Sequence, residues 1–252
     1  MKGLIIVKAL VTGASSGIGH DICLELAKRG VSIVAVGRSR ERLEALKSQI
    51  GCEIISTDLS IRENCFKLYE KVSNVDILIN NAGFGDVGFF TETDLEKELS
   101  MIDTNITAMH ILAKLYLKDM CNKNFGYILN TASIASFLTG PLMATYYSTK
   151  AYVLRLTRAI DYELKKQNKN VYIGALCPGP VATRFDKVAG VSFSLNSVSS
   201  EAVANLAVKQ MFEGKKTIIP TLGVKLASFG GKILPDCVIS SLTYRSQKKK
   251  NG

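Results

Sequence analysis

The chain has 252 residues, of which 47% are hydrophobic and 21% are charged, and its formal net charge is +10. This composition excludes a disordered, collagen-like or coiled-coil chain, and the length suits one large α/β domain. The basic excess is compatible with a nucleic acid, an anionic membrane or an anionic small molecule as partner, and composition does not choose between them.

Six cysteines are scattered without a CxxC pair, which favours free thiols in a reducing, cytoplasmic setting. The two histidines, His20 and His110, have no spacing typical of a zinc site or a catalytic triad, so no metal is expected. The apolar start is interrupted by Lys8 and runs into a glycine-rich turn, so it indicates a first strand and not a signal peptide. No apolar run reaches the roughly 18 residues of a transmembrane helix.

Apolar, β-branched runs alternate with helical patterns along the chain. Strands are predicted at Ile5–Thr12, Val31–Val36, Glu53–Ser56, Asp76–Asn80, Gly126–Asn130, Val171–Leu176 and Thr217–Ile219. Helices are predicted at Ile18–Arg29, Arg40–Gln49, Arg62–Val72, Leu95–Asn122, Tyr146–Lys166 and Glu201–Phe212. The pattern predicts an α/β fold: a three-layer αβα sandwich with a Rossmann-type, doubly wound parallel sheet of about seven strands, in a single domain over 1–252.

A glycine-rich loop, Thr12-Gly-Ala-Ser-Ser-Gly-Ile-Gly19, joins the first strand to the first helix. Such a loop lets backbone N–H groups approach a pyrophosphate at a helix N-terminus, although simple helix capping would use the same residues. In this position it favours a dinucleotide. The predicted binding residues are Gly13, Ser15, Ser16, Gly17, Ile18 and Gly19.

The second strand ends without an acidic residue and is followed by Arg38. Because NAD-selective folds usually place Asp or Glu there to bind the ribose hydroxyls, the missing acid favours NADP(H) over NAD(H). Arg38 is placed to bind a 2′-phosphate, and the alternative is a solvated arginine that opens the next helix.

Tyr146 and Lys150 lie four residues apart on a predicted helix, where a nearby ammonium lowers the pKa of a phenol. Tyr147 lacks this partner because Ala151 stands four residues on. A lone YxxxK is a weak signal, but Ser133, which follows a strand, is placed to hold a carbonyl oxygen beside the tyrosine hydroxyl.

Together these motifs resemble the short-chain dehydrogenase/reductase family, from the first strand to about Thr183. The family's catalytic Asn, Ser, Tyr and Lys fall on Asn105, Ser133, Tyr146 and Lys150. The resemblance adds cofactor-binding roles for Tyr146 and Lys150 and for Asp58, Leu59, Asn81, Ala82, Gly83, Pro178, Gly179, Val181 and Thr183.

The resemblance implies NADPH-dependent, reversible hydride transfer between the nicotinamide and a carbonyl or alcohol substrate. Tyr146 would be the general acid/base, and Ser133 would hold the reacting oxygen. Lys150 would hold the nicotinamide ribose and lower the Tyr146 pKa, and Asn105 would hold a water that relays protons. The alternatives are a 3-oxoacyl-thioester (acyl-carrier-protein) reductase of the same class and a non-catalytic NADP(H)-binding sensor. No nucleic acid partner is expected.

The substrate end is predicted from position in the family. Residues 184–200 would form the substrate loop, and the apolar side chains in and near the pocket would suit an apolar substrate: Phe84, Phe89, Phe90, Phe137, Leu138, Met143, Phe185, Val188, Val191, Phe193 and Leu195. Residues 221–252 resemble the extra C-terminal helical segment of one branch of the family. We expect that extension to cover the substrate site or a subunit interface, with membrane contact less favoured, and we expect a homo-oligomer, a dimer or tetramer.

Overall fold

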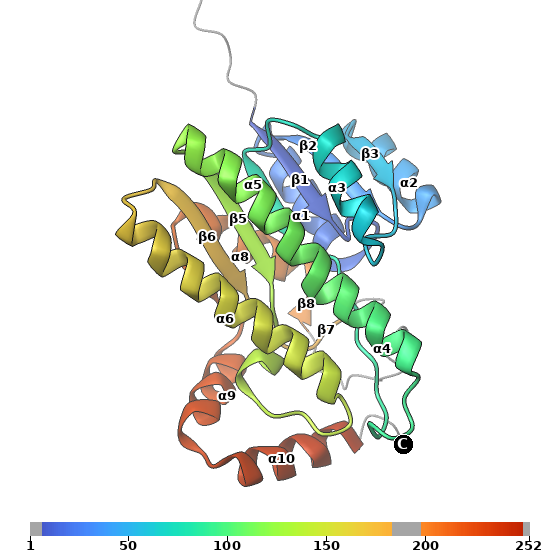
Figure 1. The fold of residues 1–252 in the computed structure, drawn as a ribbon, viewed down its shortest axis with the longest axis vertical. Helices are drawn as coiled ribbons and strands as arrows, with labels where there is room; N and C mark the ends of the chain where they lie inside the picture. The colour runs from blue at the N-terminus through green and yellow to red at the C-terminus, as the bar shows by residue number, and fades with distance from the viewer. Residues whose placement is uncertain (1–6, 183–197, 249–252) are drawn as a thin grey trace, which may run out of the picture.

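The computed structural model describes residues 7–182 and 198–248. Over these residues a single seven-stranded sheet runs in the order β3-β2-β1-β4-β5-β6-β9, with every neighbouring pair parallel (Figure 1). The strands are β1 (Lys8–Thr12), β2 (Ser32–Gly37), β3 (Glu53–Ser56), β4 (Ile77–Asn80), β5 (Gly126–Thr131), β6 (Val171–Leu176) and β9 (Thr217–Ile218). The strand order reverses between β1 and β4, and ligands of such sheets bind beyond the carboxyl ends of the strands at that point.

Helices cover both faces of the sheet, as Figure 1 shows. One face is covered by α1 (Gly17–Ala27), α2 (Arg40–Ile50) and α8 (Ser200–Phe212). The other is covered by α3 (Arg62–Lys71), α5 (Met109–Lys123) and α6 (Ala144–Lys166). The predicted three-layer, doubly wound architecture is therefore confirmed.

The central strands are apolar along their middle positions because both of their faces are buried. In β1, Ala9 and Val11 pack with helices α1 and α8, whereas Leu10 packs on the opposite face with α3 and α5. Successive side chains of a strand point to opposite faces, so a sheet covered on both sides requires an unbroken apolar run. This is the pattern that predicted the strands.

The long helix predicted over Leu95–Asn122 is divided in the structure. Helix α4 (Leu95–Ile102) passes into a π-helical segment, η1 (Asp103–Ala108), which continues into α5. Asn105 lies inside η1, and its side chain bonds to the turn after β4 and to α6. The spacing of hydrophobic residues does not reveal a π-helical segment, because the α-helices on both sides of it keep their own apolar faces.

The C-terminal extension forms two helices, α9 (Leu222–Ile233) and α10 (Asp236–Lys248), interrupted at Pro235. Helix α10 lies beside the loop between β5 and α6 (Figure 1), where Thr243 Oγ1 donates to the Thr139 carbonyl at 2.7 Å. Helix α9 contacts the short 3₁₀ helix η2 (Ile134–Phe137). A small two-stranded sheet joins β7 (Val181–Ala182) to β8 (Val198–Ser199).

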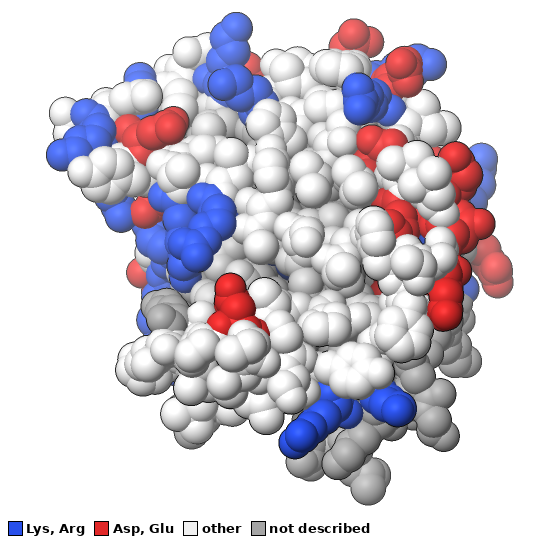
Figure 2. Space-filling model, turned by 60° about the horizontal axis from the view of Figure 1, so that its bottom comes forward, with Lys and Arg blue, Asp and Glu red and all other residues white. Residues whose placement is uncertain are grey.

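The two C-terminal helices also present apolar side chains outward. Leu226, Phe229 and Ile233 of α9 are 62–72% exposed, and Leu242 of α10 is 55% exposed. The lower part of Figure 2, where these helices come forward, is accordingly mostly uncharged. No helix in the described ranges is both long and apolar enough to span a bilayer. All six cysteines are free thiols.

Candidate active site

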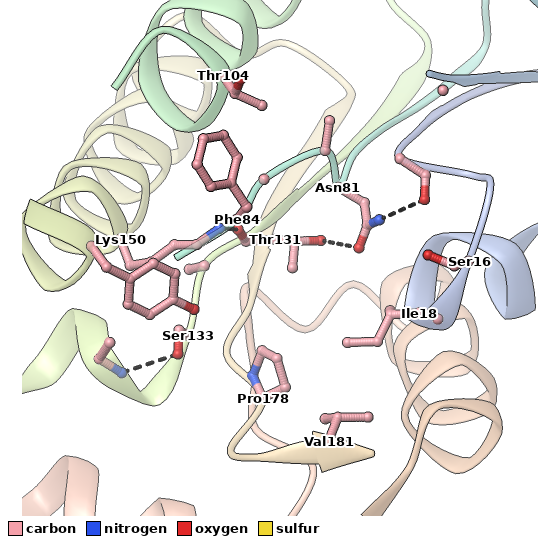
Figure 3. Close-up of a pocket in the computed structure, with 18 of the residues that line it drawn as sticks. Ser16, Ile18, Asn81, Phe84, Thr104, Thr131, Ser133, Lys150, Pro178 and Val181 are labelled. Carbon is pink, nitrogen blue, oxygen red and sulfur yellow. Dashed lines mark hydrogen bonds between the residues drawn. The ribbon is translucent and has the colours of Figure 1, made fainter. Parts of the chain in front are cut away.

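A cavity of about 670 Å³ lies at the carboxyl ends of the central strands (Figure 3). Its walls come from the loops after β1, β2, β3, β4, β5 and β6, from η1 and from the N-terminal half of α6. Gln247, from the last turn of α10, completes the lining. The cavity therefore occupies the crevice that the strand order predicts for a ligand.

The glycine-rich loop forms one wall of this cavity through Gly13, Ser15, Ser16, Gly17 and Ile18. Gly13 has φ +66°, and a Cβ there would lie 2.9 Å from Ala82 Cα, so only glycine fits the turn. Ser16 is the N-cap of α1, yet its side chain makes no capping hydrogen bond. The N–H groups of the first turn are thus left for another acceptor, and the positive end of the helix favours an anion.

Thr12 ties the glycine loop to the turn after β4. Its buried hydroxyl donates to the Ile79 carbonyl at 3.2 Å and accepts from the backbone N–H groups of Asn81 and Ala82 at 2.9 and 3.0 Å. Asn81 also accepts from Thr131 Oγ1 at 3.2 Å, a bond visible in Figure 3. Three strand ends are therefore held together on the floor of the cavity.

The far end of the cavity carries two arginines. Arg38 and Arg42 line it together with Ser39, Thr57 and Asp58. Arg38 is exposed, and Arg42 follows four residues later in the first turn of α2, so the two share a side of the helix start. Asp58 accepts from the backbone N–H and the hydroxyl of Ser60 through one oxygen, at 2.9 and 2.8 Å, which fixes its position.

Ser133, Tyr146 and Lys150 meet at the opposite end (Figure 3). A hydrogen bond joins the side chains of Tyr146 and Ser133. Lys150 is 5% exposed, and its Nζ donates to the Thr131 carbonyl at 2.8 Å and lies 5.9 Å from the centre of the Tyr146 ring. The Ser133 hydroxyl accepts from the Ala135 N–H at 3.2 Å, which orients it from η2. These three residues, from the loop after β5 and from helix α6, are brought together as predicted.

Burial governs the titration of both ionisable groups. It raises the pKa of Tyr146 to about 12, although the Ser133 hydrogen bond acts in the opposite direction. Burial also lowers the pKa of Lys150 to about 8. Burial therefore outweighs any opposing effect of Lys150 in the chain without ligand, and the expectation that Lys150 lowers the Tyr146 pKa stays a prediction. The ammonium is itself desolvated and bonded to Thr131, and it does not compensate the burial of the phenol.

Asn105 lies just outside the cavity lining. It is 2% exposed, its Oδ1 accepts from the Phe84 N–H at 3.0 Å, and its Nδ2 donates to the Phe84 carbonyl at 2.9 Å and to Thr149 Oγ1 at 3.1 Å. Its side chain thus fastens the turn after β4 to helix α6. The water relay expected of Asn105 stays a prediction.

Most residues predicted to bind a cofactor line the cavity: Gly13, Ser15, Ser16, Gly17, Ile18, Arg38, Asp58, Leu59, Asn81, Ala82, Gly83, Tyr146, Lys150, Pro178, Gly179 and Val181. Gly19 does not, because it is buried where α1 passes the loop, and a Cβ there would lie 2.5 Å from the Gly13 carbonyl oxygen. Thr183 and residues 184–197 of the predicted substrate loop lie outside the described residues.

The predicted apolar wall is only partly present. Phe84 and Met143 line the cavity. Phe89 and Phe90 are 52% and 69% exposed, whereas Phe137 and Leu138 pack in apolar clusters beside it. The remaining members of that prediction, Phe185, Val188, Val191, Phe193 and Leu195, fall outside the described residues.

Sequence reasoning missed several lining residues, among them Arg42, Thr104, Tyr147 and Gln247. Arg42 had a signal, its spacing of four from Arg38 at a helix start. The other three depend on tertiary packing. Among the residues that the structure describes, no cluster of His, Cys, Asp and Glu is suited to hold a metal ion.

Comparison with known proteins agrees with this geometry. The family model described as short chain dehydrogenase matches residues 7–191. The chain is 32% identical over 242 residues to hydroxysteroid dehydrogenase-like protein 1 of Gallus gallus, covering 86% of this chain and 71% of that protein. It is 34% identical over 178 residues to the 3-oxoacyl-(acyl-carrier-protein) reductase FabG of Rickettsia prowazekii, covering 68% of this chain and 71% of that protein.

Among solved structures, a short-chain dehydrogenase from Sphingobium yanoikuyae in complex with NADPH superposes with a TM-score of 0.82 at 27% identity, over 90% of this chain and 93% of the other. The family model covers most of the chain. The chain belongs to the short-chain dehydrogenase family.

Proposed function

We propose that this protein is an NADP(H)-dependent oxidoreductase that interconverts a carbonyl compound and its alcohol, with Tyr146 as general acid/base. One observation carries the proposal: the buried Ser133–Tyr146–Lys150 cluster and the glycine loop line the same cavity. This cluster brings together a phenol, an ammonium group and a hydroxyl, and such a set can transfer a proton to a substrate oxygen.

The described residues fit a dinucleotide. The uncapped start of α1 and the glycine loop suit the pyrophosphate, and Asp58 and Leu59 lie where the adenine would be held. We assign the nicotinamide and its ribose to the part of the cavity that is lined by Asn81, Ala82, Gly83, Lys150, Pro178, Gly179 and Val181. Bound there, the nicotinamide supplies or accepts the hydride.

The chain's own residues supply the proton. With a pKa near 12, the Tyr146 hydroxyl is protonated at neutral pH and can donate to a developing alkoxide. Ser133 has one hydroxyl proton, which lies in the hydrogen bond to Tyr146 in the free protein, and on substrate binding it can turn to the same oxygen. The Lys150 ammonium lies near the Tyr146 ring and supplies a positive charge there. We assign Asn105 a positioning role, because its side chain holds the Phe84 turn against α6.

The test of this function is NADPH oxidation over a panel of short ketones, aldehydes, steroid ketones and 3-oxoacyl thioesters. Tyr146→Phe should bind NADPH normally and lose at least about a thousandfold in turnover, since general acid catalysis contributes factors of this size. Tyr152→Phe is the matched control, because Tyr152 is on the same helix but partly exposed and bonded to His110. A Tyr146→Phe variant with near-normal turnover would overturn the assignment.

The preference for NADP(H) over NAD(H) is supported by Arg38 and Arg42, which line the far end of the cavity, and by the absence of an acid at the end of β2. Guanidinium groups suit the 2′-phosphate, which NAD(H) lacks. Replacing both arginines with alanine should weaken NADPH binding by tenfold or more and leave NADH binding nearly unchanged. Arg40→Ala is the control, since Arg40 is exposed and adjacent to Glu44. Equal effects on both cofactors would refute this preference.

The substrate panel also separates the alternatives. A 3-oxoacyl-thioester reductase is favoured by the likeness to the Rickettsia prowazekii protein of that name, and a steroid or other bulky ketone by the likeness to the Gallus gallus protein. Tight NADPH binding without oxidation of any carbonyl compound would favour the non-catalytic sensor. The buried proton donor argues against a sensor, which has no use for it.

The outward apolar faces of α9 and α10 support a homo-oligomer in which a second copy covers them. Light scattering after size exclusion should give a dimer or tetramer, and Phe229→Glu should lower that mass. A monomer at working concentration would refute this, and binding to anionic vesicles would assign the face to a membrane instead.

A further inference from the structure

Helix α10 reaches the cavity through one buried side chain, that of Gln247. This residue is 4% exposed, and its Nε2 donates to the Tyr147 hydroxyl at 2.8 Å. Helix α10 is fastened nearby through Thr139, which bonds to Thr243 and Ser240. The position of Gln247 is therefore set by the packing of the helix against the β5–α6 loop.

The polar pair that Gln247 forms with Tyr147 has unused capacity for hydrogen bonds. Gln247 Oε1 is buried and has no partner in the described part of the chain. The Tyr147 hydroxyl accepts from Gln247, and no described group accepts its proton. Burial raises the pKa of Tyr147, so the hydroxyl keeps that proton at neutral pH. A free acceptor and a free donor thus lie side by side.

The pair belongs to the cavity and faces the reacting end. Both residues line it together with Ser133, Tyr146 and Met143. The ring centres of Tyr147 and Tyr146 are 6.2 Å apart. A substrate whose carbonyl oxygen reaches Tyr146 would place atoms only a few bonds away beside the pair.

Unpaired buried polar groups are costly, and native proteins rarely retain them without a partner or a role. We propose that Gln247 and Tyr147 form a second polar subsite, which binds a neutral substrate group that both donates and accepts a hydrogen bond. A hydroxyl or a primary amide has this chemistry, because its donor and acceptor lie on one side: its proton goes to Gln247 Oε1, and its oxygen accepts from Tyr147. A carboxylate does not, because it has no proton to offer.

This inference rests on the proposed carbonyl reduction and narrows its substrates. They carry an amide or hydroxyl a few bonds from the reacting carbon, in a cavity that also holds the apolar Phe84 and Met143. A site built to hydrogen-bond a substrate group discriminates strongly against the analogue that lacks it, since its own polar atoms are then left unpaired.

The test uses two matched pairs of ketones and NADPH. The first pair is 3-oxobutanamide, which has a primary amide, and 4-methyl-2-pentanone, which has two methyl groups in place of the amide oxygen and nitrogen. The second is 4-(4-hydroxyphenyl)-2-butanone and 4-phenyl-2-butanone. The wild type should prefer the polar member of at least one pair by tenfold or more in kcat/KM.

Gln247→Met should reduce this preference below threefold, mainly through a higher KM for the polar member, and leave the apolar member nearly unaffected. Tyr147→Phe, which keeps the ring, tests the other half of the pair and serves if the first variant does not fold. Ser246→Met is the control, because Ser246 is an exposed neighbour on α10.

The outcomes separate the two proposals. If no member of either pair is reduced by the wild type and the wider panel is also inactive, the carbonyl reductase function fails. If the wild type reduces these ketones without preference, or the variants keep its preference, the subsite fails while the function stands. Equal losses on both members of a pair also refute the subsite and make the Gln247–Tyr147 bond a latch for α10.

Discussion

Replacing Lys150 with methionine should make the protein without cofactor more stable at pH 7. Burial lowers the pKa of this lysine from 10.5 to about 8, so at pH 7 the folded state holds a charge that its surroundings disfavour. At about 1.4 kcal/mol for each pKa unit, the shift corresponds to about 3 kcal/mol. The methionine variant also loses the hydrogen bond to the Thr131 carbonyl, and this loss destabilises it by about 1–2 kcal/mol. We therefore expect a net gain of about 1–2 kcal/mol.

The pH dependence provides a sharper test, because it does not depend on how well methionine packs. Between pH 8 and 10.5 the unfolded chain binds the Lys150 proton and the folded chain releases it, so the wild-type free energy of unfolding rises with pH. Between pH 7 and 9.5 this rise amounts to about 2 kcal/mol. The methionine variant lacks this contribution, so the difference between the two proteins should fall or reverse over that range.

Urea unfolding of both proteins at pH 7 and 9.5 measures these differences directly. Lys165→Met is the matched control, since Lys165 is on the same helix but exposed and paired with Asp161. It should change stability by a similar amount at both pH values. If the Lys150→Met and wild-type stabilities follow parallel pH profiles, the lysine is not desolvated as the structure indicates and the reasoning fails.

Three further predictions concern Gly83, Thr12 and Asp161. Gly83→Ala would place a Cβ 2.8 Å from Asn105 Oδ1, so we expect at least a tenfold loss of turnover with near-normal circular dichroism. Thr12→Val removes the hydroxyl that serves the turn after β4 and should cost about 2–3 kcal/mol in urea unfolding, whereas Thr12→Ser should cost less than half of that. At Asp161 burial would raise the pKa, but hydrogen bonds from two lysines hold it below its ordinary value. Asp161→Asn should therefore destabilise the protein at neutral pH. In thermal melts over a pH series, the difference in stability between wild type and variant should shrink as the pH falls below about 4.

The fold was predictable because its signals are local. Each central strand contains an apolar run, such as Ile77–Ile79, and polar or turn residues follow it. The glycine loop and the Tyr146–Lys150 spacing are local as well, and the structure places both at the cavity. For these features, local sequence pattern and tertiary position agree.

The rest of the site depends on contacts that no local pattern encodes. Gln247 and Tyr147 are 100 positions apart, and nothing in the spacing of either indicates that they meet. The pKa of Tyr146 is raised by burial, which the sequence does not reveal and which acts against the lowering that its spacing from Lys150 predicts. The π-helical segment likewise follows from bonds to Phe84 and Thr149 on other elements.

The π-helical segment Asp103–Ala108 constrains the number of residues between α4 and α5. A π turn holds one residue more than an α turn, and one residue rotates a helix face by about 100°. The segment therefore sets α4 and α5 out of phase, so that Met101 and Tyr116 can both be buried against different neighbours. Removing a single residue here would restore a regular helix but turn one of these faces toward solvent. Substitutions within the segment should consequently be tolerated far better than insertions or deletions.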